Sequence, residues 1–308
     1  MITVLSGGTG TPKLLQGLME VLDQEAITVI VNTAEDQWLP HGFLSPDIDT
    51  VLYTLSGRVE EGTWYGVKGD TFQTHQALLE LGAEEIHRIG DRDRAVHIHR
   101  GALMRQGKSL SEVVEEHRRA FGVRAGVFPM TDSMVETVIA TPVGEMDLHR
   151  YLIVHKGALE VNGIKFRGLE EARGCPGAVE AIERADGIII GPSNPVSSIL
   201  PIVSIRELKK ALQQRRDRAI AISPLINRAP VSGPADRFME ARGISPDSAG
   251  VATVYKGLIS GLIVDERDRD WERARALGMN CYRTDTIMKG LEEKRALARF
   301  TLRMLGVG

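Results

Sequence analysis

The chain has 308 residues, of which 43% are hydrophobic and 26% are charged, and its formal net charge is −3. These values are typical of a globular protein with one large or two ordinary domains. They exclude a basic nucleic-acid-binding surface, and no apolar run has membrane-spanning length. Cys175 and Cys281 lack the spacing of a CxxC or zinc site, which favours a reducing compartment. We therefore expect a cytoplasmic protein.

The first strand signal is followed by a glycine-rich loop. Ile2–Leu5 predicts a buried strand, and the sequence SGGTGTPK follows it. Glycines let a ligand approach the backbone, and free N–H groups at the start of the next helix favour an anion. A plain strand-to-helix turn explains the pattern equally well, since a lysine stands where a dinucleotide fingerprint has its last glycine. The candidate phosphate-binding residues here are Gly7, Gly8, Thr9, Gly10 and Lys13.

A second strand–loop–helix signal lies near residue 190. Three consecutive isoleucines, residues 188–190, predict a strand buried on both faces. The chain then turns at Gly191–Pro192, and Asn194–Pro195 predicts an N-cap followed by proline at the first helical position. Such a turn directs backbone N–H groups at one point, which suits a phosphate, although an ordinary connection can share the pattern. The candidates are Gly191, Pro192, Ser193 and Asn194.

Acidic residues follow the second strand-like run, Ala26–Val31. Asp36, Asp47 and Asp49 are the obvious carboxylates for a hard cation. Mg²⁺ takes one or two carboxylates together with substrate phosphates, so an aspartate pair beside a phosphate loop has a chemical purpose. A polar turn would explain the Asp-x-Asp pattern as well.

Further patterns predict helix starts and a charged cluster. Asp70 is expected to cap a helix, and Ser-x-x-Glu patterns at residues 109–112 and 204–207 predict capping boxes. The run RIGDRDR, residues 88–94, has the alternating charge of a solvated surface, but its glycine also permits a rigid Arg/Asp cluster near the phosphate site. His97 and His99 could bind a metal if they shared one face of a strand, but structural roles are more common for such histidines and no third ligand is evident.

Strand-like runs and helices alternate along most of the chain, with about seven strands. This predicts a Rossmann-like, doubly wound, mostly parallel α/β sheet with helices on both faces, in one domain spanning residues 1–308. Short β-like segments at about 127–170 predict a small inserted antiparallel piece, to which no chemistry can be assigned. The polar loops follow strands, after Leu5, Val31, Ile190, Ile222 and Val264. Since ligands bind outside the carboxyl ends of such strands, the loops predict one site for a nucleotide or other phosphorylated ligand.

The motifs, in this order, closely resemble those of the archaeal 2-phospho-L-lactate transferases of coenzyme F-420 biosynthesis. They are SGGTGTPKL at 6–14, NTAED at 32–36, SPDIDT at 45–50, GDRDR at 90–94, GPSNP at 191–195, PVSGP at 230–234 and DERDR at 265–269. The resemblance spans nearly the whole chain, and the combination is far more specific than any single motif.

This resemblance implies a magnesium-dependent transferase with a Rossmann-like core. The family joins Fo, a hydroxylated deazaflavin with a ribityl chain, to a phospholactyl group carried on a guanosine diphosphate ester, and GMP leaves. Similar proteins use a phosphoenolpyruvyl donor, and both donors present the same phosphates. The resemblance assigns contacts with Fo to Asp49 and Arg88, and the guanosine diphosphate part to residues 191–195.

The expected mechanism places magnesium on Asp49, with Asp36 as the second ligand. Backbone N–H groups of the two glycine loops hold the phosphates in line with the ribityl hydroxyl. Lys13 or Arg92 stabilises the leaving GMP, and Asp49 or Asp91 accepts the hydroxyl proton. Transfers of this kind need positioning and charge stabilisation rather than a covalent nucleophile. A homodimer is expected because symmetric dimers are common.

Two alternatives share this fold class. Bacterial gluconeogenesis-factor proteins look like distant relatives that sense nucleotide-sugars without catalysis, but the segments at 45–50 and 191–195 match the transferases. An NAD-dependent oxidoreductase is disfavoured because the third fingerprint glycine and a convincing ribose-binding acid are missing. Trp38, Trp64 and Phe72 are equal candidates for the aromatic wall that holds the deazaflavin ring.

Overall fold

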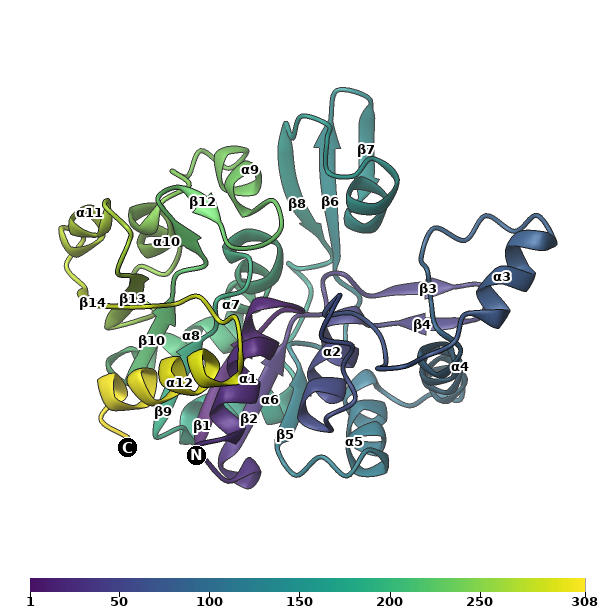
Figure 1. Ribbon diagram of the computed structural model, residues 1–308, viewed down its shortest axis with the longest axis horizontal. Coiled ribbons are helices and arrows are strands. Elements are labelled where there is room, and N and C mark those ends of the chain that lie inside the picture. The colour runs from purple at the N-terminus through teal and green to yellow at the C-terminus, as the bar shows by residue number, and fades with distance from the viewer. Residues whose placement is uncertain (308) are drawn as a thin grey trace.

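The computed structural model describes residues 1–307, and its centre is a seven-stranded sheet with all neighbouring strands parallel (Figure 1). The strand order is β14-β13-β10-β9-β1-β2-β5. The strands are β1 (Ile2–Ser6), β2 (Ile27–Val31), β5 (Gly126–Pro129), β9 (Gly187–Ile190), β10 (Ala219–Ile222), β13 (Gly261–Asp265) and β14 (Asn280–Thr284). The predicted Rossmann-like α/β fold is confirmed.

Helices cover both faces of the sheet and form two hydrophobic clusters. One cluster contains α1 (Gly10–Met19), α2 (Pro46–Leu55), α5 (Leu110–Ala120) and α12 (Leu291–Leu305). The other contains α6 (Pro176–Arg184), α7 (Leu200–Ser204), α8 (Arg206–Gln214), α9 (Ala235–Glu240) and α10 (Ser248–Val254). Ile188 and Ile190 belong to one cluster and Ile189 to the other, so this strand is buried on both faces as predicted. Among residues 1–307, no helix combines the length and the apolar character needed to cross a membrane.

The order of the strands reverses between β1 and β9. From β1 the chain builds outward through β2 to β5, and from β9 it builds the other way through β10 and β13 to β14. Leu5 at the end of β1 pairs with Ile190 at the end of β9, so the two glycine loops leave the sheet side by side. In open α/β sheets such a switch point is where ligands bind.

The final helix supports the first one. Helix α12 packs on α1 so closely that a Cβ on Gly17 would lie 2.1 Å from the carbonyl oxygen of Lys294. Lys294 also donates to the side chain of Gln16. Helix α1, which follows the first glycine loop, is therefore held in place by α12.

The antiparallel piece is a three-stranded sheet, β7-β6-β8, that projects from the top of the molecule in Figure 1. Its strands are β6 (Glu136–Thr141), β7 (Gly144–Asp147) and β8 (Gly163–Arg167), whereas residues 126–129 belong to the main sheet. Within the stretch expected to contain short β-like segments, Arg150–Val154 instead form a π-helix, η2. Tyr151 packs against Phe238 of α9, which anchors this π-helix to the core.

The remaining elements lie outside the central sheet. They are the hairpins β3–β4 (Gln37–Leu39, Gly42–Leu44) and β11–β12 (Leu225–Ile226, Ala229–Pro230), helices α3 (Gln73–Glu80), α4 (Asp91–Arg105) and α11 (Trp271–Arg275), a second π-helix η3 (Pro195–Ile199), and the 3₁₀ turns η1 (Gln24–Ala26) and η4 (Arg216–Arg218). His97 and His99 lie in the helix α4, so they do not share the face of a strand that joint metal binding would have required.

The predicted helix starts have mixed outcomes. Asn194 is an N-cap whose Oδ1 accepts from the N–H groups of Val196 and Ser197, as predicted. The capping box at 109–112 is also confirmed. The one at 204–207 is wrong, because α7 ends at residue 204 and Glu207 instead accepts from the backbone N–H of Gly174.

Candidate functional site

The two glycine loops interlock at the switch point. Ser193 Oγ lies 3.1 Å from the backbone nitrogen of Gly7 and 2.7 Å from Thr11 Oγ1. A Cβ on Gly10 would lie 1.9 Å from the carbonyl oxygen of Pro192, so any side chain there would collide with backbone. The glycines therefore permit the close approach of the two loops.

This contact leaves the start of α1 open to a ligand. Its N-cap residue, Thr9, makes no side-chain capping hydrogen bond. Gly8–Gly10 and Pro192–Asn194 line a cavity of about 180 Å³, which we call the loop cavity. Backbone N–H groups at a helix start favour an anion, because they lack intrahelical partners and stand at the positive end of the helix dipole.

A second, larger cavity of about 410 Å³ adjoins the loop cavity. We call it the aromatic cavity, because Trp64, Tyr65, His87 and His149 line it together with Arg88. Four residues, Gly8, Thr9, Glu35 and Asp47, line both cavities. The two therefore meet along one shared wall.

A third cavity of about 390 Å³ continues outward from the aromatic cavity. We call it the outer cavity. It shares Thr63, Tyr65 and Arg88 with the aromatic cavity and adds Phe72, over whose ring the Arg88 guanidinium stacks at 4.1 Å. The three cavities form a row that begins at the glycine loops and ends beside Arg88 and Phe72.

Two carboxylates occupy the wall between the loop and aromatic cavities. Asp47 is buried in the first turn of α2, where its Oδ2 accepts from Asn32 Nδ2 at 2.9 Å. Burial raises the pKa of Asp47 to about 7. Burial and the nearby Asp47 and Asp36 raise the pKa of Glu35 well above its ordinary value. Carboxylates held this way serve as cation ligands or as proton acceptors near neutral pH.

Asp36 lies behind this wall. Its Oδ2 accepts from Ser45 Oγ at 2.8 Å, while its buried Oδ1 has no hydrogen-bond partner among residues 1–307. Burial raises its pKa well above the usual range. It lines a separate cavity of about 290 Å³ that Glu35 and His149 also border.

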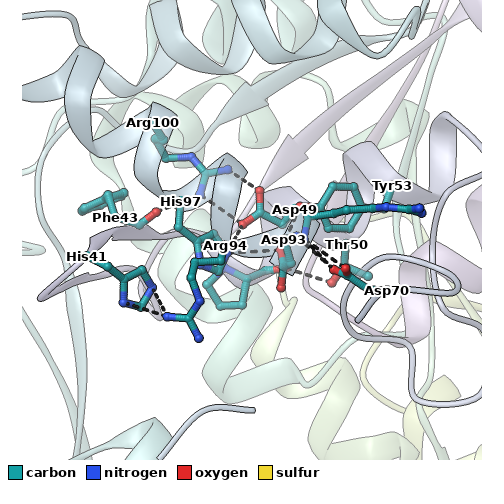
Figure 2. A network of polar contacts seen from close by, with 12 residues as sticks. His41, Phe43, Asp49, Thr50, Tyr53, Asp70, Asp93, Arg94, His97 and Arg100 are labelled. Atoms are coloured by element: carbon teal, nitrogen blue, oxygen red, sulfur yellow. Dashed lines mark hydrogen bonds and ion pairs between the residues drawn. The ribbon is translucent and has the colours of Figure 1, made fainter. Parts of the chain in front are cut away.

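Asp49 lines none of these four cavities and takes part in a buried network between α2 and α4 (Figure 2). Its carboxylate pairs with the Arg100 guanidinium and lies 3.3 Å from His97 Nε2. The same His97 nitrogen lies 3.2 Å from Asp93, which accepts from the Tyr53 hydroxyl at 2.8 Å. Burial opposes ionisation of Asp49, but Arg100 and His97 hold its pKa well below the ordinary value.

This network is balanced in charge without a metal ion. Oxygen and nitrogen atoms of Asp49, Asp93 and His97 lie within 4.8 Å of one another, a spacing compatible with a metal site. However, although burial disfavours the imidazolium, the two carboxylates raise the pKa of His97 to about 9. Since His97 and Arg100 are cations, they already neutralise both aspartates. A metal ion could bind His97 only by displacing the imidazolium proton, because a protonated histidine offers no lone pair.

The other predicted site residues fall into two groups. Gly8–Gly10, Pro192–Asn194 and Arg88 line the row of cavities, while Gly7 and Gly191 support the loops from behind. Neither the loop cavity nor the aromatic cavity is lined by Lys13, Asp36, Asp49, Asp91 or Arg92. Lys13 places its ammonium over the Trp64 ring, Asp91 caps α3, Arg92 is exposed beside a different cavity, and Asp49 is buried as described.

Sequence reasoning missed several residues that line the cavities. Glu35 has no predicted role, and Asp47, although one of the three candidate cation ligands, has no part in the expected mechanism, which uses Asp36 and Asp49. His149 and Ile153 come from the inserted piece, to which no chemistry had been assigned. The loop after β13 was expected at the site, but Asp265 there pairs with Arg267 and lines none of these cavities. A usable signal existed for Asp47, because Ser45–Pro46 marks a helix start.

Comparisons with known proteins agree with the sequence motifs. The family model described as 2-phospho-L-lactate transferase CofD matches residues 2–299. The 2-phospho-L-lactate transferase of Methanothermobacter thermautotrophicus is 46% identical over 303 residues, which cover 98% of this chain and 97% of that protein. The one from Methanocaldococcus jannaschii is 45% identical over 310 residues, covering 99% and 98%.

A solved structure shares the fold. A crystal structure of a UPF0052-family protein from Bacillus halodurans superposes with a TM-score of 0.67, covers 98% of both chains and is 16% identical. At this identity the likeness concerns the fold alone.

Proposed function

Because the chain belongs to the 2-phospho-L-lactate transferase (CofD) family, we propose that it makes the phosphodiester of a coenzyme F-420 precursor from Fo. In this reaction a phospholactyl or phosphoenolpyruvyl group moves from a guanosine diphosphate ester to the terminal ribityl hydroxyl of Fo. The hydroxyl oxygen forms a bond to the distal phosphorus, the bond from that phosphorus to the bridging oxygen breaks, and GMP leaves.

The observation that carries this proposal is the shared wall between two different cavities. The loop cavity offers backbone N–H groups and serine hydroxyls, which suit the diphosphate of the donor. The aromatic and outer cavities offer Trp64, Tyr65, Phe72 and the Arg88 guanidinium, which suit a flat, hydroxylated ring system. Glu35 and Asp47 lie between them, where the transferred phosphoryl group must pass.

Magnesium fits this wall better than it fits Asp49. Glu35 and Asp47 are oxygen donors that face the loop cavity, and without a cation the charge of Asp47 disfavours ionisation of both Glu35 and Asp36. Glu35 is partly exposed to the cavity and, with donor phosphate oxygens, would hold the ion. When bound, magnesium neutralises charge on the diphosphate. Asp49, already paired with Arg100, has no such role in this proposal.

Asp47 is the proton acceptor in this proposal. Its pKa of about 7 is suited to removing the ribityl proton at neutral pH, and its position on both cavities gives it access to donor and acceptor. Asn32 donates to Asp47 Oδ2, while Asp47 Oδ1 lies against Gly8, where an added Cβ would be only 2.3 Å away. The glycine loops position the phosphates, so that catalysis consists of orientation and charge stabilisation.

The test is a chromatographic assay with fluorescence detection of the deazaflavin. Purified protein, Fo and magnesium are mixed with the phospholactyl or the phosphoenolpyruvyl guanosine donor. We expect a more acidic deazaflavin product and stoichiometric GMP with one of them, and that donor is the substrate. Absence of product with both donors, while Fo still binds, contradicts the transferase function and favours a ligand-sensing protein.

A further inference from the structure

A fifth cavity, of about 460 Å³, lies outside the row of three. It is formed by the end of α2 and the residues after it, the first turns of α4, and Phe121 after α5. It shares Val67 with the outer cavity and no residue with the loop or aromatic cavity. We call it the basic cavity, because Arg58, Lys68 and Arg92 line it.

The basic cavity contains positive charge with no carboxylate to match it. Its lining residues include three cations and no acid, whereas each of the four cavities described above includes at least one aspartate or glutamate. Within residues 1–307, none of the side chains of Arg58, Lys68 and Arg92 forms an ion pair or a hydrogen bond. In a chain with a net charge of −3, this local excess is a distinct feature.

The cations project from a defined wall. The Arg58 guanidinium stacks over the Phe121 ring at 4.9 Å, and Phe121 packs against Tyr53 with ring centroids 5.9 Å apart. The backbone N–H of Lys68 donates to the Arg58 carbonyl at 2.7 Å, which ties two of the cations together. Arg92 faces them from the first turn of α4. An ordered guanidinium loses less conformational entropy when it binds an anion than a free one does.

We propose that the basic cavity is a second anion-binding site for a small molecule that carries a diphosphate or a comparable pair of anionic groups. It is separate from the loop and aromatic cavities, which together we call the transfer cleft. Three cations around one hollow match the charge of two adjacent phosphates, and arginine forks suit phosphate oxygens. Tyr53, Val67, Val96 and Phe121 supply an apolar wall that can contact the uncharged part of such a molecule. The proposal does not depend on the transferase function.

The proposed anion site gives a role to the Arg92 side chain, which borders the basic cavity. The sequence suggested that Arg92 stabilises the leaving GMP, but its side chain borders the basic cavity rather than the loop cavity. The backbone N–H of Arg92 does not reach the loop cavity either, because it donates to Asp70. The guanidinium is thereby left free to bind an anion on this side of α4.

The experiment titrates inorganic pyrophosphate into the full-length protein by isothermal calorimetry at low ionic strength. Lys68→Gln with Arg92→Gln removes two cations from the cavity and leaves Arg58 on Phe121. Lys209→Gln with Lys210→Gln is the matched control, since it removes the same charge from an exposed part of α8 that lines none of the five cavities. Unchanged melting temperatures verify that both pairs are folded.

We expect the cavity variant to bind one pyrophosphate fewer per chain than the control, or to bind it at least tenfold more weakly at one site. Binding of pyrophosphate in the loop cavity should be the same in both variants, because neither changes a residue that lines it, so it does not obscure the difference. Identical isotherms for the two variants overturn the proposal. Equal weakening in both also overturns it, because the effect would then come from net charge alone. GDP in place of pyrophosphate shows whether a nucleotide or a bare diphosphate binds more tightly.

Discussion

Asp70 and Asp91 cap each other's helices. The Asp70 carboxylate accepts from the backbone N–H groups of Arg92 and Asp93 at the start of α4. The Asp91 carboxylate accepts from the N–H groups of Gln73 and Thr74 at the start of α3. Asp70 therefore caps a helix, as its sequence context suggested, but the helix is α4 and not the one that follows it directly.

This reciprocal capping predicts that Asp91 is structural. Asp91→Asn should retain transferase activity, because asparagine also caps helices well. Asp91→Ala should lower the melting temperature by a few degrees and leave kcat near that of the wild type. Activity assays and thermal denaturation of both variants check this. If Asp91→Asn loses most of its kcat while its melting temperature is unchanged, Asp91 is the proton acceptor after all.

The shared wall predicts separate effects for its two carboxylates. Asp47→Asn should reduce kcat by about 10²–10⁴-fold, the usual contribution of a general base. Wild-type activity should rise as the pH rises through about 7, because the pKa of Asp47 is raised to that value and only the ionised form accepts a proton. Asp47→Asn should lose this dependence in a pH–rate profile.

Glu35→Gln should instead increase the magnesium concentration needed for half-maximal activity. Glu183→Gln, an exposed change on α6 that lines none of the cavities, is the control. A magnesium titration of each variant measures the effect. Should Glu35→Gln match the control while Asp49→Asn loses its magnesium response in a folded protein, the metal belongs to Asp49 as the sequence first indicated.

The buried network predicts a loss of stability at alkaline pH. The folded pKa of His97, about 9, lies above the value of about 6.5 for an unfolded histidine. The pairing of its imidazolium therefore stabilises the fold fully below pH 6.5 and is lost as the pH rises through 9. Thermal denaturation from pH 6 to 10 should show a falling melting temperature. His97→Gln should remove this dependence, whereas His99→Gln, exposed on the same helix, should keep it.

Removing Asp49 should destabilise the fold more than it alters the chemistry. Asp49→Asn leaves Arg100, which is fully buried, without its carboxylate, and breaking a buried ion pair costs about 3–5 kcal/mol. Chemical denaturation measures this loss. A variant with wild-type stability and no activity would contradict the structural role and restore Asp49 to the transfer cleft.

The inserted piece predicts a pair of substrate-specific effects. Leu152 lines the loop cavity and Ile153 the aromatic cavity, while Val154 on the same π-helix lines neither. All three are partly exposed, at 36%, 39% and 44%. Ile153→Ala should raise the KM for Fo about fivefold, and Leu152→Ala the KM for the donor, since each loses about 1 kcal/mol of apolar contact.

Val154→Ala is the matched control and should change neither KM. Steady-state kinetics with each substrate varied in turn separates the two effects. Equal changes in all three variants would mean that the π-helix acts only through stability.

The sequence was sufficient for the main sheet and for the glycine loops, because these depend on local patterns. Triple isoleucine, Gly-Pro turns and an Asn-Pro start each have one common structural outcome. The choice among acidic residues needs geometry that the sequence does not contain. Residues two apart on a helix point in nearly opposite directions, so Asp47 and Asp49 in α2 cannot both face one ligand. Which of them faces the cavities depends on how α2 lies against α4, which is a tertiary contact.

The position of β1 has a consequence for the order in which the protein can be made. The first glycine loop leaves the ribosome early, yet its partner strand β9 begins at Gly187, and the helix that supports α1 ends at Leu305. During translation one edge of β1 therefore stays unpaired until β9 has been synthesised. The contact between α1 and α12 can form only after residues 291–305 have been synthesised, and a truncation that removes α12 should leave a first loop without rigid support.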